Sequence, residues 1–267
     1  MQDRVYILGT RGSVPVSGRE FIKYGGASTC VVLRLAGETL VLDAGSGMLR
    51  LPGYLREGDK NICLLLSHSH ADHIIGLPMC PCSLDSSFSY DIYLKTREQL
   101  GPKEQLGTLL QLPIWPVGPD ELPASFNFHE LKDIFTLGEI EVRTMEGDHP
   151  GGCSLMRLSG NGKIVVFATD SVINDGNIEP FTAFAKGCDL LMIDGQYSQE
   201  EFDGHPNFGH NSYSQAALIG RLVDAKKTLI IHHSSFATDE QLDAAGREVL
   251  AINPRCEFAR EGQEVAI

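Results

Sequence analysis

One stretch of seven residues constrains this chain more than any other. Residues 67–73 read Ser-His-Ser-His-Ala-Asp-His and follow an apolar run at residues 62–66, which has the length and composition of a buried strand. In an extended chain, residues two positions apart point to the same side, so His68 and His70 can reach one metal ion together. Three imidazoles and a carboxylate within six residues therefore predict a site for a divalent metal.

The second half of this stretch predicts a second ion. Asp72 and His73 lie where the chain is expected to turn into a short helix, and both side chains can face an ion beside the first. The alternative is a histidine-rich surface loop without a ligand. We prefer the metal site, because further ligand-type residues follow other strands of the chain.

Length and composition predict one α/β domain over residues 1–267, although two small domains are the alternative. No run approaches the roughly 18 apolar residues of a membrane span, and the first residues lead into a strand and not a signal peptide. We therefore expect a soluble, cytoplasmic protein with no membrane partner.

The cysteines predict reduced thiols. There are seven, an odd and scattered set in a chain this long, which does not indicate a disulfide framework. Cys80 and Cys82 form the only close pair. We interpret them as two incidental loop thiols in preference to a structural zinc clip.

The net charge of −13 should repel a long polyanion, because nucleic-acid binding depends on arrays of Lys and Arg. Nucleic acid is therefore not the expected partner. Two divalent ions would still place about +4 of formal charge in one cleft, so a small anionic substrate can bind there despite the acidic exterior.

Periodicity and turn residues divide the chain into short elements. Strands are predicted at residues 5–8, 30–35, 39–42, 62–66, 91–95, 126–131, 140–145, 154–159, 163–168, 190–193 and 228–231, and helices at 97–110, 178–185, 212–225 and 239–252. Residues 112–123 hold four prolines and the only tryptophan, so they predict a covering loop, with a lid or a dimer contact as alternatives. The dimer-contact alternative would make the protein a homodimer.

Five of the apolar strands end in Asp or His, which is what a sandwich needs if metals bind along one edge. Beyond residues 67–73, the residues concerned are His149, Asp170, Asp194 and the pair His232-His233. Asp148 is an alternative ligand to His149. Asp43 also follows a strand, and we expect it to support a ligand and not to cap a turn.

The glycine-rich loop at residues 10–26 carries Arg11, Arg19, Lys23 and Tyr24. It is expected either to border a substrate pocket or to be a solvated surface loop. The sequence alone does not separate these two interpretations.

Seven ligand-type residues resemble the motif of the metallo-β-lactamase superfamily, over nearly the whole chain: His68, His70, Asp72, His73, His149, Asp170 and His232. The resemblance implies an α/β fold, the four-layer αββα sandwich, with two metal ions at its open edge. It implies one ion held by His68, His70 and His149, another held by Asp72, His73 and His232, and a bridging Asp170. His233 is the alternative to His232. Zinc is the default metal, and the donors also tolerate manganese or iron.

Three further segments, residues 24–29, 194–197 and 208–212, are similar to the branch that contains ribonuclease Z and small phosphodiesterases. In that branch the histidine matching His210 assists at the scissile phosphate, and the acid matching Asp194 supports it. We expect hydrolysis of a small or cyclic phosphodiester by a hydroxide between two ions, with Asp72 accepting its proton. His210 would either donate a hydrogen bond to a phosphate oxygen or protonate the leaving oxygen. The alternatives are a lactone or thioester hydrolase, a ribonuclease Z-like nuclease and a non-enzymatic metal-stabilised binding module. The acidic charge and the missing basic insertion disfavour the nuclease.

Overall fold

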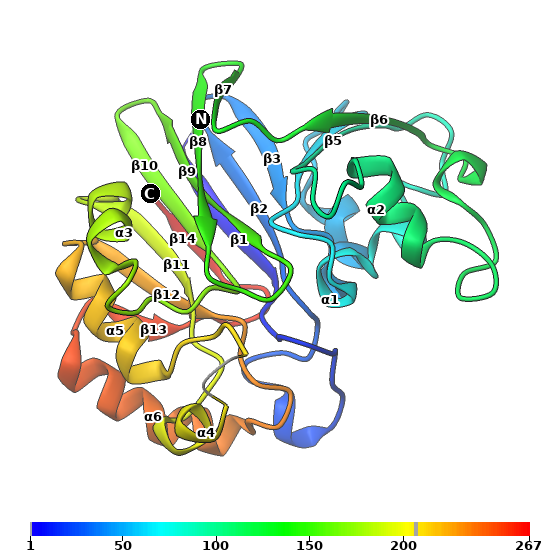
Figure 1. Ribbon diagram of the computed structural model, residues 1–267. Helices are drawn as coiled ribbons and strands as arrows, with labels where there is room; N and C mark the ends of the chain where they lie inside the picture. The colour runs from blue at the N-terminus through cyan, green and yellow to red at the C-terminus, as the bar shows by residue number, and fades with distance from the viewer. Residues whose placement is uncertain (1, 206–207) are drawn as a thin grey trace.

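Two seven-stranded sheets face each other in this computed structural model, which describes residues 2–205 and 208–267 (Figure 1). The strands of the first sheet are, in spatial order, β14 (Glu264–Ala266), β1 (Arg4–Gly9), β2 (Cys30–Leu35), β3 (Glu38–Leu42), β4 (Asn61–Leu65), β5 (Ser89–Leu94) and β6 (Ser125–Glu130). Those of the second are β13 (Cys256–Phe258), β12 (Lys227–Ile231), β11 (Leu190–Asp194), β10 (Lys163–Ala168), β9 (Cys153–Gly160), β8 (Ile140–Gly147) and β7 (Ile134–Leu137).

Helical segments cover the outer face of each sheet, as Figure 1 shows. The second sheet packs against α3 (Ile178–Ala185), α5 (Tyr213–Leu222) and α6 (Asp239–Ile252). The first packs against η2 (Ser46–Tyr54), α1 (Ala71–Ile74), η3 (Leu77–Met79) and α2 (Pro102–Leu109). The helix α4 (Gln199–Gly204) and the turns η1 (Arg19–Phe21) and η4 (Pro119–Glu121) complete the set. This arrangement confirms the predicted αββα sandwich.

The core between the sheets follows from strand alternation, because every second side chain of a strand points to the same face. Leu33 and Leu40 from the first sheet meet Leu158 and Phe167 from the second, and all four are buried. The intervening residues of each strand pack under the helices. No described helix is long and apolar enough to span a bilayer.

Strand direction explains why ligand-type residues gather at one edge. In the first sheet β3, β4, β5 and β6 pair in parallel. In the second, β8 and β10 both pair antiparallel with β9, and β10, β11 and β12 pair in parallel. The carboxyl ends of β8, β10, β11 and β12 therefore lie at one edge, which the segment after β4 also reaches: Ser154 N–H donates to Ser67 O at 2.8 Å.

The helix predicted at residues 97–110 begins later than expected. Arg97 and Leu100 instead close a tight turn through two backbone hydrogen bonds, with Glu98 and Gln99 at φ of 49° and 64°. Helix α2 starts at Pro102, because proline suits the first helical position and Gly101 precedes it. The predicted helix start at residue 97 was therefore wrong.

Several short elements were not predicted, namely β7, β13, β14, α4 and η2. Three- and four-residue strands are too short to establish a period of two, so their pairing is decided by neighbouring strands. Residues 112–123 contain, of the named elements, only the short turn η4, and Leu112 and Ile114 are exposed. All seven cysteines are free thiols.

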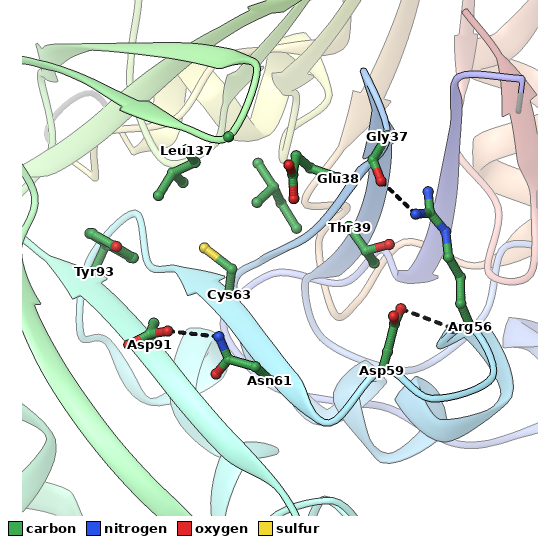
Figure 2. A pocket seen from close by; sticks show the side chains of 12 residues that line it. Gly37, Glu38, Thr39, Arg56, Asp59, Asn61, Cys63, Asp91, Tyr93 and Leu137 are labelled. Atoms are coloured by element: carbon green, nitrogen blue, oxygen red, sulfur yellow. Dashed lines mark hydrogen bonds between the residues drawn. The ribbon is translucent and has the colours of Figure 1, made fainter.

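The first sheet leaves a polar pocket of about 290 Å³ at the end remote from residues 67–73 (Figure 2). The start of β4 and the turn between β2 and β3 line it. Next to it, Asp91 accepts hydrogen bonds from Asn61 Nδ2 at 2.8 Å and from His129 Nε2 at 2.9 Å. These contacts satisfy the carboxylate of Asp91 within the sheet.

Replacing Leu33 by alanine should lower the free energy of unfolding by about 2–5 kcal/mol, because it leaves a cavity between the two sheets. Chemical denaturation of the variant and the parent measures the change. Leu250→Ala on α6, where the side chain is 50% exposed, is the control and should change stability by less than about 0.5 kcal/mol. Equal effects of the two substitutions would contradict the assigned core.

Candidate metal centre

The strand ends bring all seven predicted ligand residues into two neighbouring donor groups. The first group is His68, His70 and His149. The second is Asp72, His73, Asp170 and His232. In each group one potential ligand atom per residue lies within 4.8 Å of the others. These residues come from segments after β4, β8, β10 and β12, so only the folded chain assembles them.

The first donor group combines His68 and His70, which follow β4 of the first sheet, with His149, which follows β8 of the second sheet. His149 Nε2 lies 3.1 Å from His70 Nδ1. His68 Nδ1 contacts Ser67 Oγ at 3.0 Å, whereas its Nε2 is buried and has no hydrogen-bond partner among the described residues. A buried nitrogen that points at two other imidazoles without a partner is suited to a cation.

The second donor group is more compact. His73 Nε2 lies 3.3 Å from His232 Nε2, 3.2 Å from Asp72 Oδ2 and 3.3 Å from Asp170 Oδ1. His232 Nε2 lies 3.2 Å from each of the same two carboxylate oxygens. A tetrahedral ion with bonds of about 2.0 Å spaces its donor atoms about 3.3 Å apart, so these atoms fit one ion.

Asp170 lies between the two groups and faces both. Its Oδ1 belongs to the second group, while its Oδ2 lies 3.8 Å from His68 Nε2 and 3.8 Å from His149 Nε2. A carboxylate with one oxygen toward each group can contact two ions at once. The geometry therefore fits the bridging position that the resemblance implied.

Protonation differs between the groups. Burial lowers the pKa of His149 to about 4 and that of His68 well below its usual value, so these imidazoles are neutral near pH 7. Burial also acts on His232, but Asp170, Asp194 and Asp72 outweigh it and raise its pKa to about 10. The carboxylates raise the pKa of His73 as well. The second group thus holds protons where a cation would sit.

Three residues at the strand ends have left-handed backbone, which non-glycine residues rarely adopt. Asp43, Asp170 and His232 have φ of 58°, 49° and 63° and follow β3, β10 and β12. Each conformation turns the chain sharply where the strand stops. Such strain persists only where the surroundings over-determine it, and it clusters at functional sites.

Asp43 supports the second group, as we expected. Its Oδ2 contacts His73 Nδ1 at 2.7 Å and accepts from Ser67 Oγ at 2.9 Å, and its Oδ1 accepts from Ser67 N at 2.7 Å. A proton on His73 Nδ1 donated to this carboxylate leaves the lone pair of Nε2 pointing at the donor group.

Asp194 and His210 lie beside both groups. Asp194 Oδ2 contacts His210 Nδ1 at 2.8 Å and His232 Nδ1 at 3.2 Å, and its Oδ1 accepts from Asn211 N at 2.8 Å. The carboxylate therefore orients the imidazole of His210 and lies within ion-pair distance of His232. A ring nitrogen of His210 also lies within 4.8 Å of ligand atoms of His149 and Asp170.

The two alternative ligands lie elsewhere. Asp148 accepts a hydrogen bond from Asn174 Nδ2 at 2.9 Å and is exposed. His233 Nε2 lies 2.9 Å from Ala259 O, and burial lowers the pKa of His233 to about 3. Neither residue belongs to a donor group, so the preferences for His149 and His232 agree with the geometry.

Three of the side chains singled out in the loop at residues 10–26 have partners away from the metal centre. Lys23 Nζ and Tyr24 Oη contact Asp243 on α6, at 2.5 Å and 2.7 Å, and Arg11 is fully buried. Sequence reasoning missed what the loop does contribute: Ser13 N–H donates to Asp72 Oδ2 at 2.7 Å. A backbone donor has no residue signature, so no pattern could have identified it.

Uptake of divalent ions by the metal-free chain should release protons at pH 7, because His73 and His232 hold protons that a metal must displace. Between pH 6 and pH 8 the apparent affinity should rise, about tenfold per pH unit for each proton released. Calorimetry in two buffers of different ionisation enthalpy measures the number released. Affinity that is constant or falls over this interval would contradict the assigned protonation.

Comparison with known proteins connects this geometry to a family. A family model described as a beta-lactamase superfamily domain matches residues 39–233, a span that includes all seven donor residues. The chain is 22% identical to a ribonuclease Z of Natronomonas pharaonis over 88% of this chain and 88% of that protein. It is 23% identical to the probable metallo-hydrolase YhfI of Bacillus subtilis over 97% of this chain and 98% of that protein.

Solved structures share the fold over the whole chain. The crystal structure of YhfI from Bacillus subtilis has a TM-score of 0.76 at 20% identity and covers 99% of both chains. A diphosphatase from the PhnP family has a TM-score of 0.71 at 18% identity, over 100% of this chain and 98% of that one. This chain therefore belongs to the metallo-β-lactamase superfamily, in the branch of ribonuclease Z and PhnP-like proteins, as a metal-dependent hydrolase.

Proposed function

We propose that this protein is a dinuclear phosphodiesterase that acts on a small or cyclic phosphodiester. The observation that carries the proposal is the position of His210, which lies beside both donor groups while its Nδ1 is held by Asp194. An imidazole in this position is not required to hold either ion. It is available to act on a substrate that the ions bind.

We assign one ion to His68, His70 and His149, a second to Asp72, His73 and His232, and a bridging role to Asp170. The spacing within the second donor group, about one tetrahedral edge between neighbouring atoms, supports zinc. Manganese and iron also accept nitrogen and oxygen donors. Elemental analysis of the purified protein identifies the bound metal.

Divalent ions bound there would supply Lewis acidity, polarising a phosphoryl oxygen and making water acidic enough to ionise near neutral pH. Asp72 would accept the proton of the attacking water, because its Oδ2 faces the space between the donor atoms. His210 would donate a proton from Nε2 to the leaving oxygen. Asp194, which accepts from Nδ1, fixes the orientation of that imidazole.

A small substrate is supported by the space beside the first donor group. A cavity of about 150 Å³ adjoins it, lined by His68, His70, Arg97, Gln105 and Gly152 among others. Sites for drug-sized ligands begin at roughly 300 Å³, so this cavity suits a compact group next to the phosphate. The net charge of −13 likewise opposes a long polyanion.

A second candidate function is that of an RNA-processing nuclease, because several similar proteins carry the name of such an enzyme. Several curated relatives at 22–25% identity are named ribonuclease Z. Such a nuclease must hold a long polyanion, and its affinity would depend steeply on salt. A precursor tRNA in the substrate panel therefore separates the two candidates.

Replacing His210 by alanine should lower turnover of bis-p-nitrophenyl phosphate by about 10² or more while the metal content stays unchanged, because a positioned proton donor is lost. Steady-state kinetics and elemental analysis of the same preparation provide both values. His129→Ala is the matched control: His129 also contacts an aspartate, Asp91 at 2.9 Å, but lies near the remote pocket. Unchanged turnover of His210→Ala would remove His210 from the mechanism.

In a side-by-side panel, we expect cyclic nucleotides or cyclic sugar phosphates to be hydrolysed faster than lactones and thioesters, because two divalent ions would stabilise the charge on phosphoryl oxygens that neutral esters lack. The measurement is kcat/KM for each substrate with the same zinc-loaded protein. A higher kcat/KM for precursor tRNA would favour the nuclease. A higher value for a lactone or thioester would exclude the phosphodiesterase.

A further inference from the structure

Arg11 is a fully buried arginine at the edge where the metal centre lies, although its loop was expected either to border a substrate pocket or to be a solvated surface loop. Its guanidinium donates to three backbone carbonyls: from Nε to Gly25 O at 2.7 Å, and from Nη1 to Ser234 O at 2.9 Å and Ala237 O at 2.7 Å. The ring of Phe21 lies 5.0 Å from its Cζ. The side chain thus ties two loops together and cannot reach a substrate.

The backbone of Arg11 joins the two sheets. It forms isolated bridges with Ser28, which precedes β2, and with His233, which follows β12. Gly12 N–H donates to His233 O at 2.9 Å, and His233 N–H donates to Thr10 O at 2.8 Å. Residues 10–12 therefore fix the backbone immediately after His232.

The two residues after Arg11 contact the second donor group directly. A Cβ on Gly12 would lie 2.4 Å from His232 Nδ1, so only glycine lets this backbone pack against that imidazole. Ser13 N–H donates to Asp72 Oδ2 at 2.7 Å. Asp72 and His232 belong to the second group, and neither contact reaches the first group.

Both contacts involve strained backbone. Ser13 and His232 each have φ of 63°, in the left-handed region that disfavours residues with a Cβ. Such conformations persist only where neighbouring contacts over-determine them. Arg11 supplies those contacts, since its guanidinium holds Ser234 and Ala237 just beyond His232, and Ser235 Oγ donates to Gly12 O at 2.7 Å.

Burying a cation is costly unless its hydrogen bonds are made. Here Nε and Nη1 donate to carbonyls and not to a carboxylate, and Nη2 has no hydrogen-bond partner among the described residues. Lysine carries one point charge and cannot reproduce the planar fork that serves three carbonyls in two loops. The identity of the residue, and not only its charge, is what the geometry requires.

We propose that Arg11 is a positioning residue for the second donor group, acting through Gly12 and Ser13 on His232 and Asp72. The inference rests on the proposed two-ion site. It predicts that loss of the guanidinium lowers the affinity for the ion at the second donor group selectively. The contacts of residues 12 and 13 are with His232 and Asp72, which belong to that group.

The test compares Arg11→Lys and Arg11→Met with the parent chain in zinc stoichiometry, by elemental analysis, and in zinc affinity, by competition with a chromophoric chelator. We expect the affinity of the chain for one of the two zinc ions, the one we assign to the second donor group, to fall about 10–100-fold. Losing a residue that supports a metal ligand typically has an effect of this size. The affinity for the zinc ion at the first donor group should be unchanged. Added zinc should restore the turnover of Arg11→Lys. Equal loss of both ions, or retention of both at unchanged affinity, would overturn the proposal.

Arg34→Lys and Arg34→Met are the matched controls, because Arg34 Nη2 also donates to a carbonyl, Tyr54 O at 2.8 Å, remote from the donor groups. They should leave both ions in place. If the Arg11 variants do not fold, Ser235→Ala is the alternative variant. It removes the hydrogen bond to Gly12 O and leaves the buried guanidinium in place. Unchanged affinity of this variant for both zinc ions would then overturn the proposal. A parent chain that binds fewer than two zinc ions would instead contradict the two-ion site.

Discussion

The structure is organised around one electrostatic constraint: five imidazoles and two carboxylates converge at one edge, in two groups whose potential ligand atoms lie within 4.8 Å of one another. His73 and His232 approach each other to 3.3 Å, and His70 and His149 to 3.1 Å. Without a cation, the second group keeps protons on buried histidines and the first keeps a buried nitrogen unpaired. Divalent charge satisfies both groups at once, which is why the surrounding residues can be understood as supports for that charge.

In this sandwich, short loops are enough to bring the donor residues together. Strands β8, β10, β11 and β12 run in one direction, so one short turn after each delivers a side chain to the same edge. The remaining ligands come from a single segment after β4. Left-handed backbone at Asp170 and His232 then aims each side chain without lengthening the loop. Fold and donor set are therefore linked through strand direction.

Sequence could predict the donors, since His68 and His70 follow from a period of two and the later ligands from strands that end in Asp or His. The four layers followed from the family resemblance. Sequence could not predict backbone conformation or contacts made by main-chain atoms. The positive φ of Asp43, the amide of Ser13 on Asp72 and the burial of Arg11 depend on neighbours more than twenty residues away. The turn at residues 97–100 was missed because Glu and Gln give no turn signal.

The most direct test of this account is anomalous scattering at the zinc edge from crystals of the zinc-loaded chain. The account predicts two peaks. One lies about 2.0–2.2 Å from donor atoms of His68, His70 and His149, the other at the same distance from Asp72, His73 and His232, with Asp170 between them. A single peak, or peaks away from these side chains, would contradict it.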